Sequence, residues 1–93
     1  MKITLSGKFL NKLQNQLDYI SEDKPKAAQK FKKDIFTEIR QIVKMPYKHR
    51  VSIHFNDNNV REVSFKGYLV IYKIKPELNE IEVFGFIKYT LNP

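Results

Sequence analysis

The chain has 93 residues, with 17 Lys and Arg, 10 Asp and Glu, two His and no Cys. Its length fits one domain over residues 1–93, because domains cluster near ~100–150 residues, and its 42% hydrophobic content is too high for a disordered chain. The formal net charge of +7 points to an acidic partner, and the lack of Cys excludes a disulfide framework, a thiolate zinc site and a cysteine nucleophile.

The first 23 residues predict a short strand followed by a helix. Residues 2–5 alternate between polar and apolar side chains and fit an edge strand. From Phe9 to Ile20 the large apolar residues recur every three or four positions, which is the spacing of one buried stripe on a helix. Ser6 precedes this stripe and can cap the helix, because its hydroxyl accepts a hydrogen bond from the free amides of the first turn.

A second helix is expected from about Lys24 to Lys44, where the apolar residues again repeat at intervals of three and four. We expect Asp23 to cap this helix and Pro25 to lie in its first turn, where a missing amide hydrogen costs nothing. Pro46 then ends the helix, since the residue before a proline avoids helical angles. Two helices joined by so few residues form an antiparallel hairpin.

After the second helix the hydrophobic period changes to two, which predicts strands at residues 51–55, 60–65 and 81–87. Residues 57–59, 66–67 and 76–80 have the composition of turns. The segment 68–75 is apolar on both faces and therefore belongs in the middle of a sheet. Helices first and strands afterwards predict an α+β fold, in which a two-helix antiparallel hairpin packs on a mainly antiparallel twisted β-sheet.

No targeting or membrane segment is expected. The first residues contain no apolar core of a secretory signal, and no apolar run approaches the ~18 residues that a membrane span needs. We therefore expect a cytoplasmic protein with no membrane partner.

The positive charge is concentrated between residues 24 and 50. This segment carries nine basic and two acidic residues, a net charge of +7, whereas residues 1–23 are neutral overall. The cluster is either a solvated helix face or a contact surface for phosphates or for a carboxylate-rich partner. The candidate contacts for a partner are Lys26, Lys30, Lys33, Arg40, Lys48, Arg50, Arg61, Tyr68 and Tyr72.

The sequence contains no standard catalytic or cofactor motif, so neither a cofactor nor a metal is expected. The three glycines are too far apart for a phosphate-binding or dinucleotide-binding loop. His49 and His54 lack carboxylates at the spacing of a metal site, and His54 fits an ordinary sheet residue. His49 lies in the basic run Lys48-His49-Arg50, where its imidazole can contact a phosphate or act as a general base.

The order of the elements and one run of residues resemble the RelE/ParE superfamily of bacterial toxins. The run consists of Val60-Arg61-Glu62-Val63 followed by Gly67-Tyr68-Leu69-Val70-Ile71-Tyr72, and Ala27-Ala28 with Phe31 matches a pattern of the second helix. The resemblance extends from Phe9 to Ile87. It implies a RelE/ParE-like fold and the toxin of a type II toxin–antitoxin pair, neutralised by an antitoxin whose acidic, partly disordered segment folds across the toxin.

The resembled superfamily divides in function. RelE-like members cut messenger RNA on the ribosome, whereas ParE-like members act against DNA gyrase and are not nucleases. In RNA-cleaving members a basic residue commonly follows the tyrosine of the central strand, but here that residue is Leu69, which can neither donate a proton nor stabilise a phosphorane. Many ParE-like members keep an Arg there too. The candidates left for RNA cleavage are Arg61, Lys88, Tyr89 and His49.

Within the resembled superfamily, the long helical hairpin and the poor catalytic set favour a ParE-like toxin that binds a target such as DNA gyrase and has no nuclease activity. Two alternatives remain open. The first is a RelE-like, ribosome-dependent endoribonuclease acting on messenger RNA, and the second is a non-toxic basic binding module.

Overall fold

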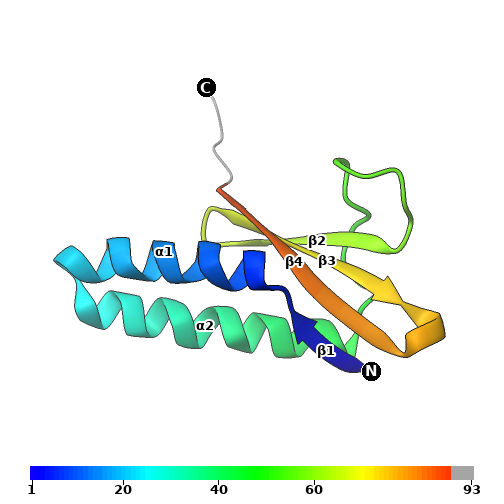
Figure 1. Cartoon of the computed structure of the whole chain (residues 1–93), viewed down its shortest axis with the longest axis horizontal. Coiled ribbons are helices and arrows are strands. Elements are labelled where there is room, and N and C mark those ends of the chain that lie inside the picture. Colours follow the sequence, from blue (N-terminus) through cyan, green and yellow to red (C-terminus); the bar gives the residue numbers. More distant parts are fainter. Residues whose placement is uncertain (89–93) are drawn as a thin grey trace.

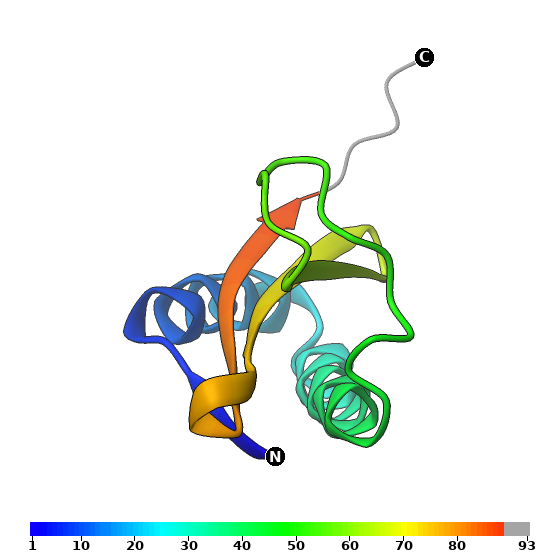
Figure 2. The ribbon, with the colours of Figure 1, turned by 90° about the vertical axis from the view of Figure 1, so that its right-hand side faces the viewer.

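The computed structural model describes residues 1–88 and has the α+β architecture that the sequence predicts. The elements in chain order are β1 (Lys2–Leu5), α1 (Gly7–Asp23), α2 (Pro25–Lys44), β2 (Val60–Phe65), β3 (Tyr68–Lys75), a 3-10 turn (Pro76–Leu78) and β4 (Glu80–Lys88). Both helices lie on one face of a four-stranded sheet with the strand order β1-β4-β3-β2 (Figures 1 and 2). Within residues 1–88, no helix is long and apolar enough to cross a lipid bilayer.

The helical hairpin forms as predicted, except at its junction. The Ser6 hydroxyl accepts a hydrogen bond from the Phe9 amide at 3.0 Å and caps α1. Asp23, however, belongs to the last turn of α1 and does not cap α2. The break falls at Lys24, whose amide still donates to the Ile20 carbonyl and whose carbonyl already accepts from Ala28. The reason is Pro25, which removes helical angles from the residue directly before it.

Three strands form the predicted antiparallel meander, and the fourth departs from it. β2 pairs with β3 and β3 pairs with β4 in antiparallel fashion, whereas the edge strand β1 runs parallel to β4. Lys66 and Gly67 both have positive φ angles, 46° and 83°, and form the two-residue turn between β2 and β3. Such a turn matches the right-handed twist of the strands that it joins.

A β-bulge in β4 changes which of its side chains face the helices. The pairing shifts between Ile71, opposite Gly85, and Tyr72, opposite Val83, so that one extra residue of β4 is left between them. Val83 before the bulge and Phe86 after it are both part of the core under the helices. Because Val83 and Phe86 are three residues apart, the regular alternation of a strand without a bulge would place these two side chains on opposite faces.

The prediction of a strand at residues 51–55 is wrong. Only one isolated bridge forms there, between Val51 and Arg61, and the rest of the segment is a loop. Ser52 is the buried residue, while Ile53 is 84% exposed. The Ser52 hydroxyl lies 3.3 Å from the His54 amide, which donates to it, and such local hydrogen bonds compete with strand pairing. His54 is therefore a loop residue and not part of the sheet.

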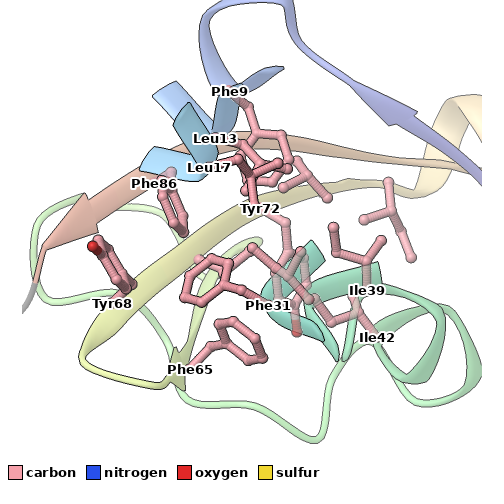
Figure 3. Close-up of a cluster of buried hydrophobic side chains, with 14 of the residues drawn as sticks. Phe9, Leu13, Leu17, Phe31, Ile39, Ile42, Phe65, Tyr68, Tyr72 and Phe86 are labelled. Carbon is pink, nitrogen blue, oxygen red and sulfur yellow. The ribbon is translucent and has the colours of Figure 1, made fainter. Parts of the chain in front are cut away.

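Most of the core lies between the helices and the sheet. Phe9, Leu13 and Leu17 of α1 and a matching stripe of α2 pack on the inner face of β3 and β4 (Figure 3). The opposite face of the sheet has a smaller cluster made by Val60, Leu69 and Ile71, with Phe84 packed against it. Both faces of β3 are therefore buried, as its sequence predicts.

Candidate functional site

Four of the candidate contacts lie along one exposed face of α2: Lys26, Lys30, Lys33 and Arg40. The helical period keeps these residues within a sector of about 80°, on the side opposite the buried Phe31 and Ile35. Lys44 continues the same face toward the end of the helix. We call these five residues the α2 stripe. It is a line of cations about 27 Å long, since a helix rises by ~1.5 Å per residue.

One member of the α2 stripe is already paired. Lys30 lies 2.9 Å from the carboxylate of Asp34, and Lys66 from the β2–β3 turn approaches the same carboxylate oxygen to 2.6 Å. The hydrogen bonds from Lys66 and Lys30 lower the pKa of Asp34 to about 2. Asp34 therefore stays ionised over the physiological pH range and reduces the charge that Lys30 offers to a partner.

Lys48 and Arg50 lie outside the α2 stripe, in the loop of residues 45–59. Arg50 is engaged within the molecule, because its guanidinium is 2.6 Å from Oε2 of Glu62. The Glu62 side chain has no exposed surface, and its Oε1 accepts a hydrogen bond of 2.7 Å from the Ser52 hydroxyl. The partners of Glu62 therefore belong to the loop and not to a helix.

Arg61, the neighbour of Glu62 in β2, also holds the loop of residues 45–59. Its Nε donates to the Asn58 carbonyl at 2.8 Å, and Nη1 donates to the carbonyls of Tyr47 and His49 at 3.2 and 2.9 Å. The guanidinium carbon also lies 5.2 Å from the centre of the Tyr47 ring, in a cation–π contact. Three hydrogen bonds from one planar group thus fasten three loop residues to β2.

His49 and Tyr72 lie where α2 runs into the loop. The Tyr72 hydroxyl donates to the Pro46 carbonyl at 2.6 Å, and burial raises the pKa of Tyr72 to about 12. The His49 ring packs edge-on against the Tyr72 ring, with centroids 6.2 Å apart. Burial lowers the pKa of His49, which keeps the imidazole neutral near pH 7. Tyr72 is a fully buried core residue whose hydroxyl fixes the start of the loop.

The candidates for RNA cleavage do not converge in the described part of the chain. Arg61 pairs in register with Tyr72, whereas Lys88 pairs with Tyr68, near the other end of β3. These two positions are four residues apart, or ~13 Å along a strand. His49 meets Arg61 only through its backbone carbonyl, and Tyr89 lies outside the described residues.

Leu69 lies on the sheet face that is turned away from the helices. It is 4% exposed and packs with Val60 and Ile71. Phe84 covers this small cluster and itself contacts Phe55 of the loop, with ring centroids 5.5 Å apart. The position that is commonly basic in the RNA-cleaving members of the resembled superfamily is therefore part of an apolar layer in this chain. Across residues 1–88, no group of three or more His, Asp or Glu side chains is placed to hold a metal ion.

Sequence reasoning missed two arrangements. One is the cluster of the buried Glu62 with Ser52 and Arg50. Its only signal in the sequence is that Glu62 follows Val60 by two residues, which places a carboxylate on the same face of the strand as an apolar residue. The other is a hollow where α1 meets the ends of β3 and β4, lined by residues that include Lys12, Tyr19 and Lys88. These residues are far apart in the sequence, and no local pattern links them.

Comparison with known proteins agrees with this fold. Residues 3–88 match the family described as ParE toxin of type II toxin–antitoxin system, parDE. A chain from the solved structure of the chromosomal ParDE toxin–antitoxin system of P. aeruginosa superposes with a TM-score of 0.79. The two chains are 15% identical over 97% of each, a likeness that shows the fold. No curated protein matches the sequence. Because the family match spans nearly all of the described residues, the chain belongs to the ParE toxin family of type II toxin–antitoxin systems.

Proposed function

We propose that this chain is a single-domain toxin that acts by binding a target protein such as DNA gyrase, and that a cognate antitoxin neutralises it. Membership of the ParE toxin family supports the toxin role and implies an antitoxin partner. Because a target such as gyrase acts in the cytoplasm, we infer that the protein acts there too.

The observation that carries the binding mode is the arrangement around β2 and β3. The Arg61 guanidinium donates to three loop carbonyls, and Leu69 is part of an apolar cluster where RNA-cleaving toxins commonly have a cation. Cleavage of RNA needs a positioned base, a positioned acid and cations on the scissile phosphate. The residues around Arg61 are organised to hold a loop in place, which suits a surface for protein recognition.

The charge distribution supports an acidic segment in the antitoxin. The α2 stripe presents several cations on one exposed helix face, and of these only Lys30 has a carboxylate partner within residues 1–88. A negatively charged partner is steered toward such a surface, and its association is accelerated at low salt. Substituting Lys33 and Arg40 with Gln is therefore expected to slow association with the antitoxin about tenfold at low salt and much less at high salt.

Expression of the chain alone, with and without the neighbouring reading frame, tests the proposal. We expect growth arrest with induction of the DNA-damage response, rescue by the neighbouring frame, and inhibition of DNA supercoiling by gyrase in the presence of the purified chain. Primer extension on messenger RNA from the arrested cells is expected to show no new cut sites. New cut sites would establish the endoribonuclease instead, and normal growth under strong expression would reject the toxin role.

A further inference from the structure

A hollow of about 390 Å³ lies where the exposed side of α1 meets the ends of β3 and β4. It is lined by Lys12, Asn15, Gln16, Tyr19, Tyr68, Phe86 and Lys88. Both charged side chains among them are cations, and the other polar groups are two amides and two phenols. We call this site the Lys12–Lys88 hollow. Its lining has no carboxylate, although the chain as a whole carries 10 acidic residues.

The floor of the hollow is aromatic. The Tyr68 and Phe86 rings are stacked, with centroids 4.6 Å apart and planes 8° from parallel. Figure 3 shows the Tyr68 hydroxyl pointing away from the buried side chains. Burial, and to a lesser degree the nearby Tyr19, raises the pKa of Tyr68, so that its hydroxyl stays protonated. A protonated phenol at this place is a hydrogen-bond donor for an anion.

The β-bulge brings Lys88 to the hollow. Because the bulge shifts the alternation of β4, Lys88 falls opposite Tyr68, and Phe86 falls opposite Val70 on the helix side of the sheet. Lys12 and Tyr19 reach the same place from α1, where they are two turns apart on one face. The Tyr19 side chain is 71% exposed, so its ring forms an open wall and not part of the core.

The donors of the hollow have no partner in the described part of the chain. Neither Lys12 nor Lys88 takes part in an ion pair there. The hydroxyls of Tyr19 and Tyr68 likewise make no hydrogen bond to residues 1–88. Two ammonium groups and two hydroxyls thus surround an aromatic floor with their donors unused.

We propose that the Lys12–Lys88 hollow binds a carboxylate-bearing peptide segment that places an apolar side chain on the Tyr68–Phe86 floor. Resting on the proposed function, we assign this segment to the cognate antitoxin. The lysines hold carboxylates at the rim, and the amides of Asn15 and Gln16 pair with the peptide backbone. Recognition thus combines charge complementarity at the rim with a small apolar anchor in the centre.

The surroundings favour a peptide over a nucleic acid. Tyr19 also borders a neighbouring hollow whose charged side chains are Glu22, Asp23 and Lys24, with a net negative charge. A nucleic acid bears a charge at every phosphate, so a strand that left the Lys12–Lys88 hollow along α1 would meet these carboxylates. A peptide carries its negative charges at chosen positions and can pass Glu22 and Asp23 with neutral or basic residues.

Binding of the purified antitoxin from the neighbouring reading frame tests the assignment. The Lys12→Gln/Lys88→Gln double variant is compared with Lys2→Gln/Lys8→Gln, which makes the same change of charge on exposed lysines outside the hollow. We expect the first variant to bind about tenfold more weakly, because two ion pairs at the rim are lost, and the control to bind within about twofold of wild type. Equal affinities of the two variants would overturn the antitoxin assignment and leave the toxin function intact.

A short synthetic peptide tests the hollow independently of the antitoxin. The isotope-labelled chain is titrated with acetyl-Glu-Asp-Phe-Asp-Glu-amide and with the neutral acetyl-Gln-Asn-Phe-Asn-Gln-amide. We expect the acidic peptide alone to shift the amide signals of Lys12, Tyr19, Tyr68 and Phe86, and the Tyr68→Phe variant to bind a few fold more weakly through loss of one hydrogen bond. Shifts confined to other residues, or equal shifts with both peptides, would overturn the proposal.

Three further outcomes count against it. Failure of the neighbouring protein to bind wild type would reject the proposed function and the antitoxin assignment together, and the peptide titration then decides whether the hollow binds acidic segments at all. A single-stranded DNA 12-mer that displaces the acidic peptide and binds more tightly would show a nucleic-acid site. Self-association that depends on Lys12 and Lys88 would show that a second copy occupies the hollow.

Discussion

Glu62 is a fully buried carboxylate whose Oε2 lies 2.6 Å from the Arg50 guanidinium and whose Oε1 accepts a hydrogen bond from the Ser52 hydroxyl. Replacing it with Ala leaves the Ser52 hydroxyl buried without its acceptor and opens a small cavity, while the half-exposed Arg50 turns to water. We expect Glu62→Ala to lower the free energy of unfolding by about 2 kcal/mol, as measured by urea denaturation. Glu77→Ala removes an exposed carboxylate and is expected to change it by less than about 0.5 kcal/mol. Equal effects would contradict a structural role for Glu62.

Arg61 acts on the backbone of the loop, and the shape of its guanidinium matters as much as its charge. An ammonium group cannot reach the carbonyls of Tyr47, His49 and Asn58 together. In the Arg61→Lys variant we expect the loop to open several times more often, because about 1 kcal/mol of hydrogen bonding is lost. Trypsin cleavage after Lys48 and Arg50 should accelerate accordingly.

The matched control for Arg61 is Lys33→Arg, which makes the reverse exchange on an exposed helix face and is expected to leave the cleavage rate unchanged. Unchanged cleavage in Arg61→Lys as well would mean that the loop is held by Glu62 and Tyr72 alone.

At the scale of the elements, the close contact between β3 and β4 depends on a glycine. A Cβ added at Gly85 would lie 2.8 Å from the Cβ of Ile71, directly beside the bulge. We expect Gly85→Ala to destabilise the fold by ~1–3 kcal/mol, because Ile71 is buried and has little room to move. Thermal melts of both glycine variants measure this effect. Gly7→Ala, where nothing lies within 4 Å of the added atom, is expected to be neutral or slightly stabilising.

The helices and strands also differ in how far their sequences predict them. The apolar spacing of α1 and α2 and the two-sided burial of β3 could be read directly, because each is a property of neighbouring residues. Residues 51–55 have the alternation of a strand but stay in a loop, because the side chain that is buried there is Ser52, which donates a hydrogen bond to Glu62. A buried polar partner from another segment outweighed the local pattern.

For the molecule as a whole, the burial of His49 makes stability depend on pH. Burial lowers the pKa of His49, so the folded state binds a proton less readily than the unfolded state. Stability is then present above the ordinary imidazole pKa and is lost as the pH falls through the folded pKa. We expect the melting temperature to drop between about pH 7 and about pH 5, and the drop to shrink in His49→Gln.

The exposed His54 provides the comparison for this pH effect, because His54→Gln changes an imidazole that the core does not cover. This variant should keep the drop shown by wild type. An undiminished drop in His49→Gln would show that other groups titrate in this range.

The sequence by itself determined the class of the fold, the buried faces of both helices and the central place of β3, because hydrophobic periodicity is set by residues close together in the chain. Its family-like run around Arg61 and Tyr68 also led to the toxin family. Only the tertiary structure decided the parallel pairing of β1 and the roles of Arg61 and Glu62 in holding the loop. It also decided the position of the β4 bulge, which places Lys88 in the lining of the same hollow as Lys12. Each of these depends on groups that folding brings together from distant positions, and no local spacing encodes such a meeting.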